Sequence, residues 1–255
     1  MGKTAALILA AGQGTRFGGR TPKQFLELAG KALWERSLEA FLPFSDVTVV
    51  VTDEAHEAMI REALEEFPPE ASGEAVAPEI HVTRGGDSRA ESVLQGLRFL
   101  EALPAKPETV LIHDAARCLV TPEIISACLR EAEACGAAIA AVPMTDTVKE
   151  AVREEGESCP VILDTPDRSR LYKAQTPQGF SFELILGAYE AAENEGALPS
   201  LTDDASAVER FTDRGVRLTP GSPENVKITD PMDLALAETI LRIRFRKKEI
   251  IRRKR

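Results

Sequence analysis

Two hydrophobic rhythms alternate along the chain. Short stretches that are almost wholly apolar or β-branched recur at intervals, and they predict strands buried on both faces. Between them apolar residues return every three or four positions, as Leu33, Trp34, Leu38 and Phe41 do, and this spacing predicts helices with one buried face. A regular succession of strand and helix predicts a parallel sheet covered by helices on both sides.

The individual elements follow from the same pattern. Strands are expected over residues 5–10, 47–52, 80–83, 109–113, 138–142, 216–219 and 225–228, with a short extended piece over 24–28. Helices are expected over 33–41, 54–67, 122–135, 181–194 and 203–214, with another from the segment GGDSRAES to residue 100 and a long final helix from Pro231. Pro122 in a first turn and Gly136 after a last turn are favourable helix ends.

Residues 144–175 interrupt this succession. The segment lacks helical spacing and contains two candidate short strands, 147–152 and 171–173, with a highly charged stretch between them. On spacing alone it is equally well a hairpin that projects to meet another subunit or a loose surface loop. We therefore expect one domain over residues 1–241 that includes 144–175 as an arm, followed by a basic helical tail over 242–255.

The charge of the chain is unevenly distributed. The 255 residues carry a net charge of −10, yet residues 242–255 contain nine Lys or Arg and one Glu. Such a tail can bind nucleic acid or an anionic membrane, but a solvated helix end is the simpler interpretation, since cations favour a helix C-terminus. The acidic remainder argues against nucleic acid. We expect no nucleic-acid partner and no membrane partner.

Other bulk features narrow the class of protein. Apolar residues make up 44% of the chain, which is enough for a substantial core. No apolar run approaches the ~20 residues that span a bilayer, and no signal-peptide pattern precedes the first strand, so a cytoplasmic location is expected. The four cysteines form no CxxC pair and have no histidine at metal-binding spacing, which predicts reduced thiols and no zinc site.

The first candidate site is the loop after the first strand, within the sequence LILAAGQGTRFGGRTPK at residues 7–23. Glycines and alanines let backbone N–H groups approach an anion, and Arg16 and Lys23 can neutralise its charge. The loop departs from the dinucleotide fingerprint at Phe17 and from the P-loop at Arg20, where those motifs have a small residue and a lysine. It therefore predicts a nucleoside triphosphate site of another kind.

Three further segments follow expected strand ends and can meet this loop: 85–92, 114–117 and 145–147. Ligands of open α/β sheets bind at the carboxyl ends of the strands. Asp114 is a candidate Mg²⁺ ligand, because this ion takes oxygen ligands alongside phosphates, and Arg117 can hold a phosphate as a fork. Asp87 and Ser92 can bond a ribose or a base edge, whereas the structural alternative is a helix start with Asp87 or Ser88 as the N-cap.

Several motifs in order carry a resemblance. LAAGxGxR, PKQ, GGxxRxxSV, HDAAR and DTVK together resemble the sugar-phosphate cytidylyltransferases, and among them the group that acts on 2-C-methyl-D-erythritol 4-phosphate. The resemblance runs from about residue 5 to residue 241. It implies a Rossmann-like three-layer α/β/α nucleotidyltransferase fold with a mostly parallel sheet and a projecting β-arm. It also implies CTP and a polyol phosphate as substrates, Mg²⁺ as cofactor, and a homodimer formed through the 144–175 arm. Cys118 stands where the family has proline.

The resemblance assigns roles residue by residue. Arg16, Lys23, Arg168 and Lys227 would be catalytic. Substrate contacts would come from Ala10, Ala11, Gly12, Gly14, Gly86, Asp87, Ser92, Asp114, Ala115, Arg117, Thr147, Thr176 and Thr202. Asp114 would also bind the metal, and Thr147 and Arg168 on the arm would complete the site of a neighbouring subunit.

The implied reaction is transfer of a cytidylyl group from CTP to 2-C-methyl-D-erythritol 4-phosphate with release of pyrophosphate, in non-mevalonate isoprenoid biosynthesis. Ribitol 5-phosphate is the alternative acceptor, but AAG at residues 10–12 and the DTVK segment favour methylerythritol. A nucleotide-sensing scaffold is expected to lack one of Arg16, Lys23, Asp114 and Lys227, and all are present. A dinucleotide-dependent oxidoreductase is disfavoured by Phe17.

Overall fold

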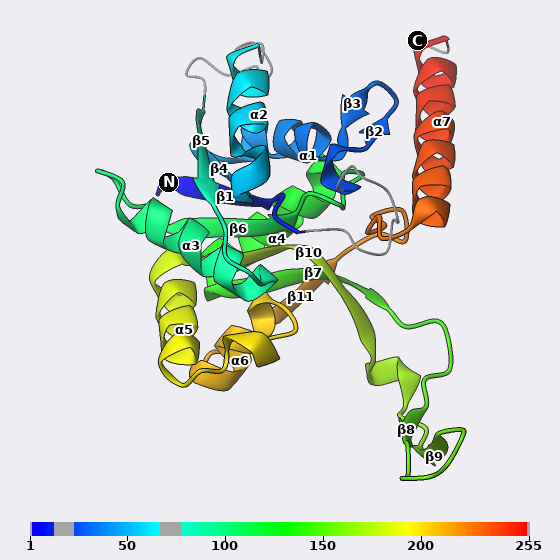
Figure 1. Ribbon diagram of the computed structural model, residues 1–255. Coiled ribbons are helices and arrows are strands. Elements are labelled where there is room, and N and C mark those ends of the chain that lie inside the picture. The colour runs from blue at the N-terminus through cyan, green and yellow to red at the C-terminus, as the bar shows by residue number, and fades with distance from the viewer. Residues whose placement is uncertain (1, 13–22, 67–77, 254–255) are drawn as a thin grey trace.

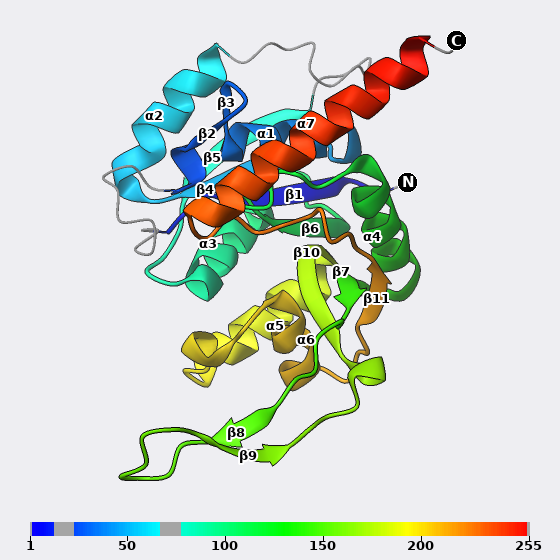
Figure 2. The ribbon, with the colours of Figure 1, turned by 90° about the vertical axis from the view of Figure 1, so that its right-hand side faces the viewer.

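A mostly parallel sheet with helices on both faces forms the body of the protein (Figures 1 and 2). The computed structural model describes residues 2–12, 23–66 and 78–253, with backbone alone for Lys23 and 248–253. In these residues seven strands form the main sheet in the order β11-β7-β10-β6-β1-β4-β5. Their bounds are β1 Thr4–Leu9, β4 Val47–Thr52, β5 Glu79–Arg84, β6 Thr109–Asp114, β7 Ala137–Pro143, β10 Tyr172–Ser181 and β11 Arg217–Pro220. The predicted fold class is confirmed.

Each face of the sheet carries its own hydrophobic core. Helices α1 Leu33–Phe41, α2 Glu54–Glu65 and α4 Pro122–Cys135 pack on one face, and α3 Arg89–Glu101, α5 Phe182–Asn194 and α6 Asp204–Phe211 pack on the other. Successive side chains of β1 alternate between the two cores, Leu7 into one and Ile8 into the other. Burial on both faces explains why these strands are continuously apolar.

Helix α7, Pro231–Arg253, packs its first half on the body through a third apolar cluster that includes Leu33, Ile228 and Ile240. Its C-terminal end extends beyond the other elements in both views (Figures 1 and 2). In the second half of α7, Ile243 and Phe245 are 46% and 56% exposed. Within the part of the chain that the structure describes, no helix combines the length and apolar character needed to cross a bilayer.

The interruption at 144–175 forms a hairpin that stands away from the body (Figures 1 and 2). Strands β8 Glu150–Val152 and β9 Val161–Asp164 pair antiparallel, and a 3₁₀ turn, η5 Arg168–Arg170, leads back to the sheet. Large apolar side chains on the hairpin are exposed, among them Ile162 at 57% and Leu163 at 61%. An exposed apolar surface on a projecting element is typical of a protein interface.

Strand β10 is longer than the sequence pattern indicated. The expected strand over 171–173 continues to Ser181 and lies antiparallel between β6 and β7. Its segment QTPQG has neither the apolar nor the β-branched character of a core strand, yet Gln175, Thr176 and Gln178 are buried. Their side chains are hydrogen-bonded inside the protein, which tertiary contacts allow and periodicity cannot reveal.

The strand expected over 225–228 is wrong, because that segment is a loop. Asn225 is fully buried, and its Nδ2 donates to the carbonyl oxygen of Thr176 at 2.9 Å. The amide of Ile228 donates to the carbonyl oxygen of Ala116 at 2.8 Å. Side-chain and single backbone bonds thus hold this segment in place of a strand ladder.

Smaller differences concern element ends. Residues 24–28 divide into the 3₁₀ turn η2 Lys23–Phe25 and strand β2 Glu27–Leu28, which pairs with β3 Lys31–Ala32. Two further 3₁₀ turns are η3 Leu42–Phe44 and η6 Leu198–Ser200. The first arm strand begins at Glu150 instead of residue 147, and α6 begins after Asp203 and ends at Phe211 instead of residue 214.

Candidate active site

A charged pocket of about 240 Å³ lies at the carboxyl edge of the sheet. Its walls come from the end of β6, the start of α3, the middle of β10, the start of α6 and the loop before α7. The lining residues are Arg89, Asp114, Arg117, Ala174, Gln175, Thr176, Gln178, Thr202, Asp203 and Lys227. Three cations face two carboxylates, so the pocket suits an anionic ligand.

Asp114 is the centre of this pocket. Its Oδ1 accepts from Nε of Arg89 at 3.0 Å, and its Oδ2 lies 2.6 Å from Nζ of Lys227. Burial alone would raise the pKa of this carboxyl, but the charges of Arg89 and Lys227 outweigh it and hold the pKa well below its usual range. Asp114 is therefore ionised and paired on both oxygens.

A chain of hydrogen bonds fixes the end of β6 that carries Asp114. Nε2 of His113 lies 3.3 Å from the carbonyl oxygen of Arg117, which can only accept, so this nitrogen carries the proton. Thr176 Oγ1 then donates to Nδ1 of His113 at 2.9 Å and accepts from the amide of Asp114 at 3.2 Å. Burial lowers the pKa of His113 to about 3, so the imidazole is neutral at physiological pH.

Arg117 presents a partly unsatisfied guanidinium. Nη1 donates to the carbonyl oxygen of Asn225 at 2.8 Å, and Nη2 lies 3.4 Å from the carbonyl oxygen of Ala174. Its buried Nε has no hydrogen-bond partner among the described residues. A buried donor without a partner is costly, so one hydrogen bond of this guanidinium is left unmade.

The first loop is described only at its start. The amide of Ala10 donates to the carbonyl oxygen of Val51 at 2.8 Å, and Ala11 is half-buried. Gly12 has φ +136°, a conformation that favours glycine, and its carbonyl oxygen accepts from Nε2 of Gln24 at 3.1 Å. Gly14 and Arg16 lie outside the described residues, as does the side chain of Lys23, so their predicted roles stay predictions.

The segment GGDSRAES confirms the helix-start interpretation. Ser88 is the N-cap of α3 and forms a capping box with Glu91. Ser92 Oγ donates to the carbonyl oxygen of Ser88 at 2.8 Å and accepts from the amide of Gly86 at 3.2 Å. A Cβ on Gly86 would lie 2.4 Å from that of Glu91, so packing already requires glycine. Asp87 is exposed beside this turn, and contacts from Gly86, Asp87 and Ser92 to a nucleoside stay predictions.

Some predicted site residues lie apart from the pocket. Ala115 is fully buried, its amide donates to the carbonyl oxygen of Leu9 at 3.1 Å, and its own carbonyl accepts from Ser37. Thr147 and Arg168 are exposed on the arm and do not line the pocket, and Nη1 of Arg168 donates to the carbonyl oxygen of Thr145 at 3.0 Å. Thr202 lines the pocket, whereas the N-cap of α6 is its neighbour Asp203.

Sequence reasoning missed three lining residues that matter here: Arg89, Gln175 and Gln178. Arg89 was visible as the fixed arginine of the motif GGxxRxxSV. Gln175 bonds the loop at Ser222, and Gln178 bonds Asp203, both by side-chain amides. The two glutamines flank the Thr176–Pro177 step of β10, and no periodicity marks that step as buried.

A carboxylate at the end of β6 meets only part of what a metal site needs. No group of three or more His, Cys, Asp or Glu in the described ranges could hold a metal ion. Asp114 is a single carboxylate, and two cations already occupy its oxygens. Mg²⁺ commonly binds through one or two carboxylates together with substrate phosphates. The residues therefore fit an ion that enters with a triphosphate, and they do not form a preformed metal cage.

The cysteines are free thiols, as the sequence predicts. Cys118 and Cys128 are buried, and burial raises the pKa of each to about 12. A thiolate is therefore scarce at neutral pH, and Cys118 packs in the third apolar cluster with Leu119.

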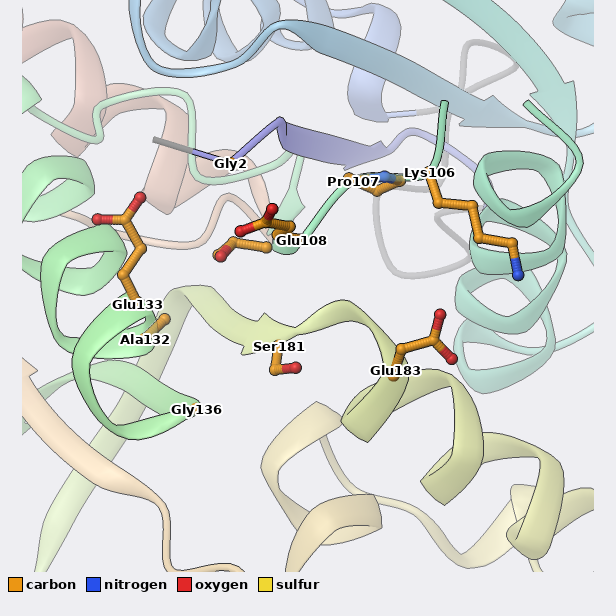
Figure 3. Close-up of a pocket in the computed structure, with 10 residues that line it drawn as sticks. Gly2, Lys106, Pro107, Glu108, Ala132, Glu133, Gly136, Ser181 and Glu183 are labelled. Carbon is orange, nitrogen blue, oxygen red and sulfur yellow. The ribbon is translucent and has the colours of Figure 1, made fainter. Parts of the chain in front are cut away.

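A larger pocket lies at the opposite edge of the sheet, where β1, β6 and β7 begin (Figure 3). It has a volume of about 740 Å³. Glu108, Glu133 and Glu183 bring three carboxylates to its rim, with Lys106 at one end. None of the predicted site residues lines it.

The fold and the charged pocket define an α/β enzyme of the nucleotidyltransferase class. Residues 4–243 match the family model described as 2-C-methyl-D-erythritol 4-phosphate cytidylyltransferase, and the chain belongs to this family.

Individual relatives agree with this membership. The chain is similar to the 2-C-methyl-D-erythritol 4-phosphate cytidylyltransferase of Prochlorococcus marinus, at 39% identity over 93% of this chain and 98% of that protein. It is 40% identical to the bifunctional enzyme IspD/IspF of Rhodopseudomonas palustris, over 94% of this chain but 56% of that longer protein. Among solved structures, 4-diphosphocytidyl-2C-methyl-D-erythritol synthase of Anaerococcus prevotii superposes with a TM-score of 0.75 at 28% identity, covering 94% of this chain and 98% of that one.

Proposed function

We propose that this protein transfers a cytidylyl group from CTP to 2-C-methyl-D-erythritol 4-phosphate, giving CDP-2-C-methyl-D-erythritol and pyrophosphate in non-mevalonate isoprenoid biosynthesis. The observation that carries the proposal is the pocket in which Asp114, Lys227 and Arg117 converge at the carboxyl edge of the sheet. That edge is where this class of sheet binds its ligands, and the family to which the chain belongs has this activity in its description.

The reaction depends on position and charge. The acceptor phosphate is already anionic at neutral pH, so its oxygen can attack the α-phosphorus of CTP without a strong general base. Lys227 is 36% exposed and can exchange its partner Asp114 for the acceptor phosphate. Arg117 lines the same pocket and provides a second cation for that phosphate. Arg16 and Lys23 would face the charge that develops on the leaving pyrophosphate.

Mg²⁺ is the proposed cofactor. When bound to the triphosphate it would supply charge neutralisation, with Asp114 as the carboxylate available to it at the end of β6. Within the chain, Arg89 keeps Asp114 ionised and in place.

The arm supports a homodimer in which each subunit completes the other's site. Its hairpin projects from the body and exposes Val161, Ile162 and Leu163 (Figure 2). Thr147 and Arg168 do not line the pocket of their own chain. We therefore assign Thr147 and Arg168 to the acceptor site of a second copy of the chain.

Pyrophosphate release tests the function directly. The purified protein is given CTP and Mg²⁺ with either 2-C-methyl-D-erythritol 4-phosphate or ribitol 5-phosphate. We expect release with the first acceptor and little with the second. Release only with ribitol 5-phosphate would identify that compound as the acceptor in place of 2-C-methyl-D-erythritol 4-phosphate. A folded protein that releases pyrophosphate with neither acceptor would contradict the proposed reaction.

A further inference from the structure

We propose that Arg89, Asp204 and Tyr189 form a positioning network that aims Asp114, and through it Lys227, for cytidylyl transfer. The inference rests on the proposed function and extends it to residues away from the reacting groups. The members come from three different elements: Arg89 begins α3, Asp204 begins α6 and Tyr189 lies within α5.

The centre of the network is a buried carboxylate. Asp204 has no exposed surface, and its two oxygens accept from Nη1 and Nη2 of Arg89 at 2.9 and 2.8 Å. Oδ1 also accepts from the hydroxyl of Tyr189 at 2.6 Å, and Tyr189 is fully buried as well. Three charge-assisted hydrogen bonds therefore fix this carboxylate and the guanidinium that faces it.

The same guanidinium reaches the active site. Its remaining nitrogen, Nε, donates to Oδ1 of Asp114 at 3.0 Å. All three nitrogens of Arg89 are thus used, two toward Asp204 and one toward Asp114. A planar fork can link two carboxylates in a fixed orientation, whereas the single ammonium of a lysine cannot reproduce this geometry.

The consequence for Asp114 is a fixed rotation. With Oδ1 held by Arg89, Oδ2 is the oxygen presented to Lys227 at 2.6 Å. When Lys227 binds the acceptor phosphate, Asp114 keeps its hydrogen bond to Arg89 and therefore stays in place. Asp204 and Tyr189 do not line the pocket, and Arg89 is the residue that links them to Asp114 by hydrogen bonds.

A purely structural ion pair is the competing explanation. The pair of Arg98 with Glu193 provides a matched control, because it also joins α3 to another helix, at 2.5 Å on the surface. It belongs to the same helix as Arg89 and has no contact with Asp114. Substitutions at the two arginines therefore separate support of the helix from support of the site.

The test measures kcat, the KM for CTP and thermal unfolding in the full-length protein. Arg89→Lys is expected to lower kcat by ~10²-fold with little change in the KM for CTP, as the loss of an aligned active-site contact does. Tyr189→Phe keeps the buried ring and is expected to lower kcat by about 3- to 10-fold, the size of one lost hydrogen bond. Arg98→Lys is expected to change neither kcat nor KM. Normal kcat in both Arg89→Lys and Tyr189→Phe overturns the network.

A double-mutant cycle keeps the proposal testable if a variant is less stable. Tyr189→Phe is introduced into the wild-type protein and into Asp114→Asn. We expect the loss in kcat to disappear in the second background, because its route to the reaction is already removed. An equal loss in both backgrounds shows that Tyr189 acts elsewhere and overturns the proposal. If the wild type is active and the variants keep its kcat, the network is contradicted but the proposed function is not. If the wild type releases no pyrophosphate, the proposed function is contradicted and the network with it.

Discussion

The two edges of the main sheet differ in how their charged side chains are arranged. At the carboxyl edge a pocket of about 240 Å³ gathers side chains whose charges are paired across elements, as Asp114 is with Arg89 and Lys227. At the amino edge a pocket of about 740 Å³ has the exposed carboxylates of Glu108, Glu133 and Glu183 at its rim, and its Lys106 pairs on the surface with Glu101. The proposed function assigns the chemistry to the smaller pocket, because its paired charges, and not its volume, suit phosphate ligands.

Chain direction explains the difference. Apart from β10, the strands of the main sheet run parallel, so their carboxyl ends and the helix starts that follow them meet at one edge. Helices α3 and α6 both begin there, bringing Arg89 and Asp204 together although they are 115 residues apart. The amino edge also receives the start of α5, which follows the antiparallel β10, and its rim carboxylates Glu108, Glu133 and Glu183 are exposed.

The largest expected effect contrasts a lysine from each edge. Lys227→Met removes the cation assigned to the acceptor phosphate, and turnover should fall by ~10²–10³-fold. Lys106→Met at the amino edge, where the side chain pairs with Glu101 at 3.0 Å, should leave turnover unchanged. Pyrophosphate release with both substrates measures each variant. Equal losses in the two variants would remove the distinction between the edges.

Mixing two inactive variants tests whether the carboxyl edge is completed by a second copy. Arg168→Ala and Lys227→Met should each be nearly inactive alone. After subunit exchange at equal amounts, mixed dimers contain one intact site, and about a quarter of wild-type activity should return. The mixture is assayed against each variant at the same total concentration. Absence of recovery, with mixed dimers demonstrated by tagged copies, would place Arg168 in the site of its own chain.

The buried His113 gives the carboxyl edge a pH dependence of stability. The unfolded chain binds a proton on this residue near its ordinary pKa of 6.5, whereas burial lowers the folded pKa to about 3. The unfolded state therefore binds more protons in this window, and the free energy of unfolding should fall by about 1.4 kcal/mol for each unit that the pH drops.

Urea unfolding between about pH 4.5 and pH 6 without substrate checks this, and comparison with His113→Gln cancels the contribution of carboxylates that titrate at the lower end of that range. His113→Gln removes the titrating group, and its slope should be smaller by one proton. An unchanged slope in His113→Gln would contradict a neutral buried imidazole at this edge.

The smallest effect is expected at the amino edge. Glu108→Gln and Glu133→Gln remove exposed carboxylates without filling the pocket, so stability should change by no more than about 0.5 kcal/mol. Turnover should stay within about twofold of the wild type, because surface changes distant from a site are usually neutral. A tenfold loss of turnover in either variant would show that the large pocket takes part in the reaction.

The sequence predicted much of the fold because local rules were followed. The helices at 33–41 and 122–135 and the strand at 47–52 have the predicted bounds. In these segments side-chain periodicity, Pro122 in a first turn and Gly136 with φ +90° all agree with the final structure. Such elements can be predicted from the sequence because their local preferences agree with the tertiary packing.

The predictions that failed lie where polar residues enter the core. Strand β10 runs through the sheet with Gln175 and Gln178 buried, and the segment at 225–228 is a loop held by Asn225. Both depend on hydrogen bonds between residues about fifty positions apart, as between Asn225 and Gln175. A local sequence pattern indicates which positions are buried, but it does not identify the distant hydrogen-bond partner of a buried polar group.

The candidate site divides in the same way. By itself the sequence determined which strand ends meet at one edge and which motifs follow them, and thereby Asp114 and Arg117 as candidates, while the family resemblance added Lys227. Only the tertiary structure decided that Arg89 is shared between Asp114 and a fully buried Asp204. Motifs record the residues near the chemistry, whereas the pairing of buried charges depends on distances between elements that no linear spacing contains.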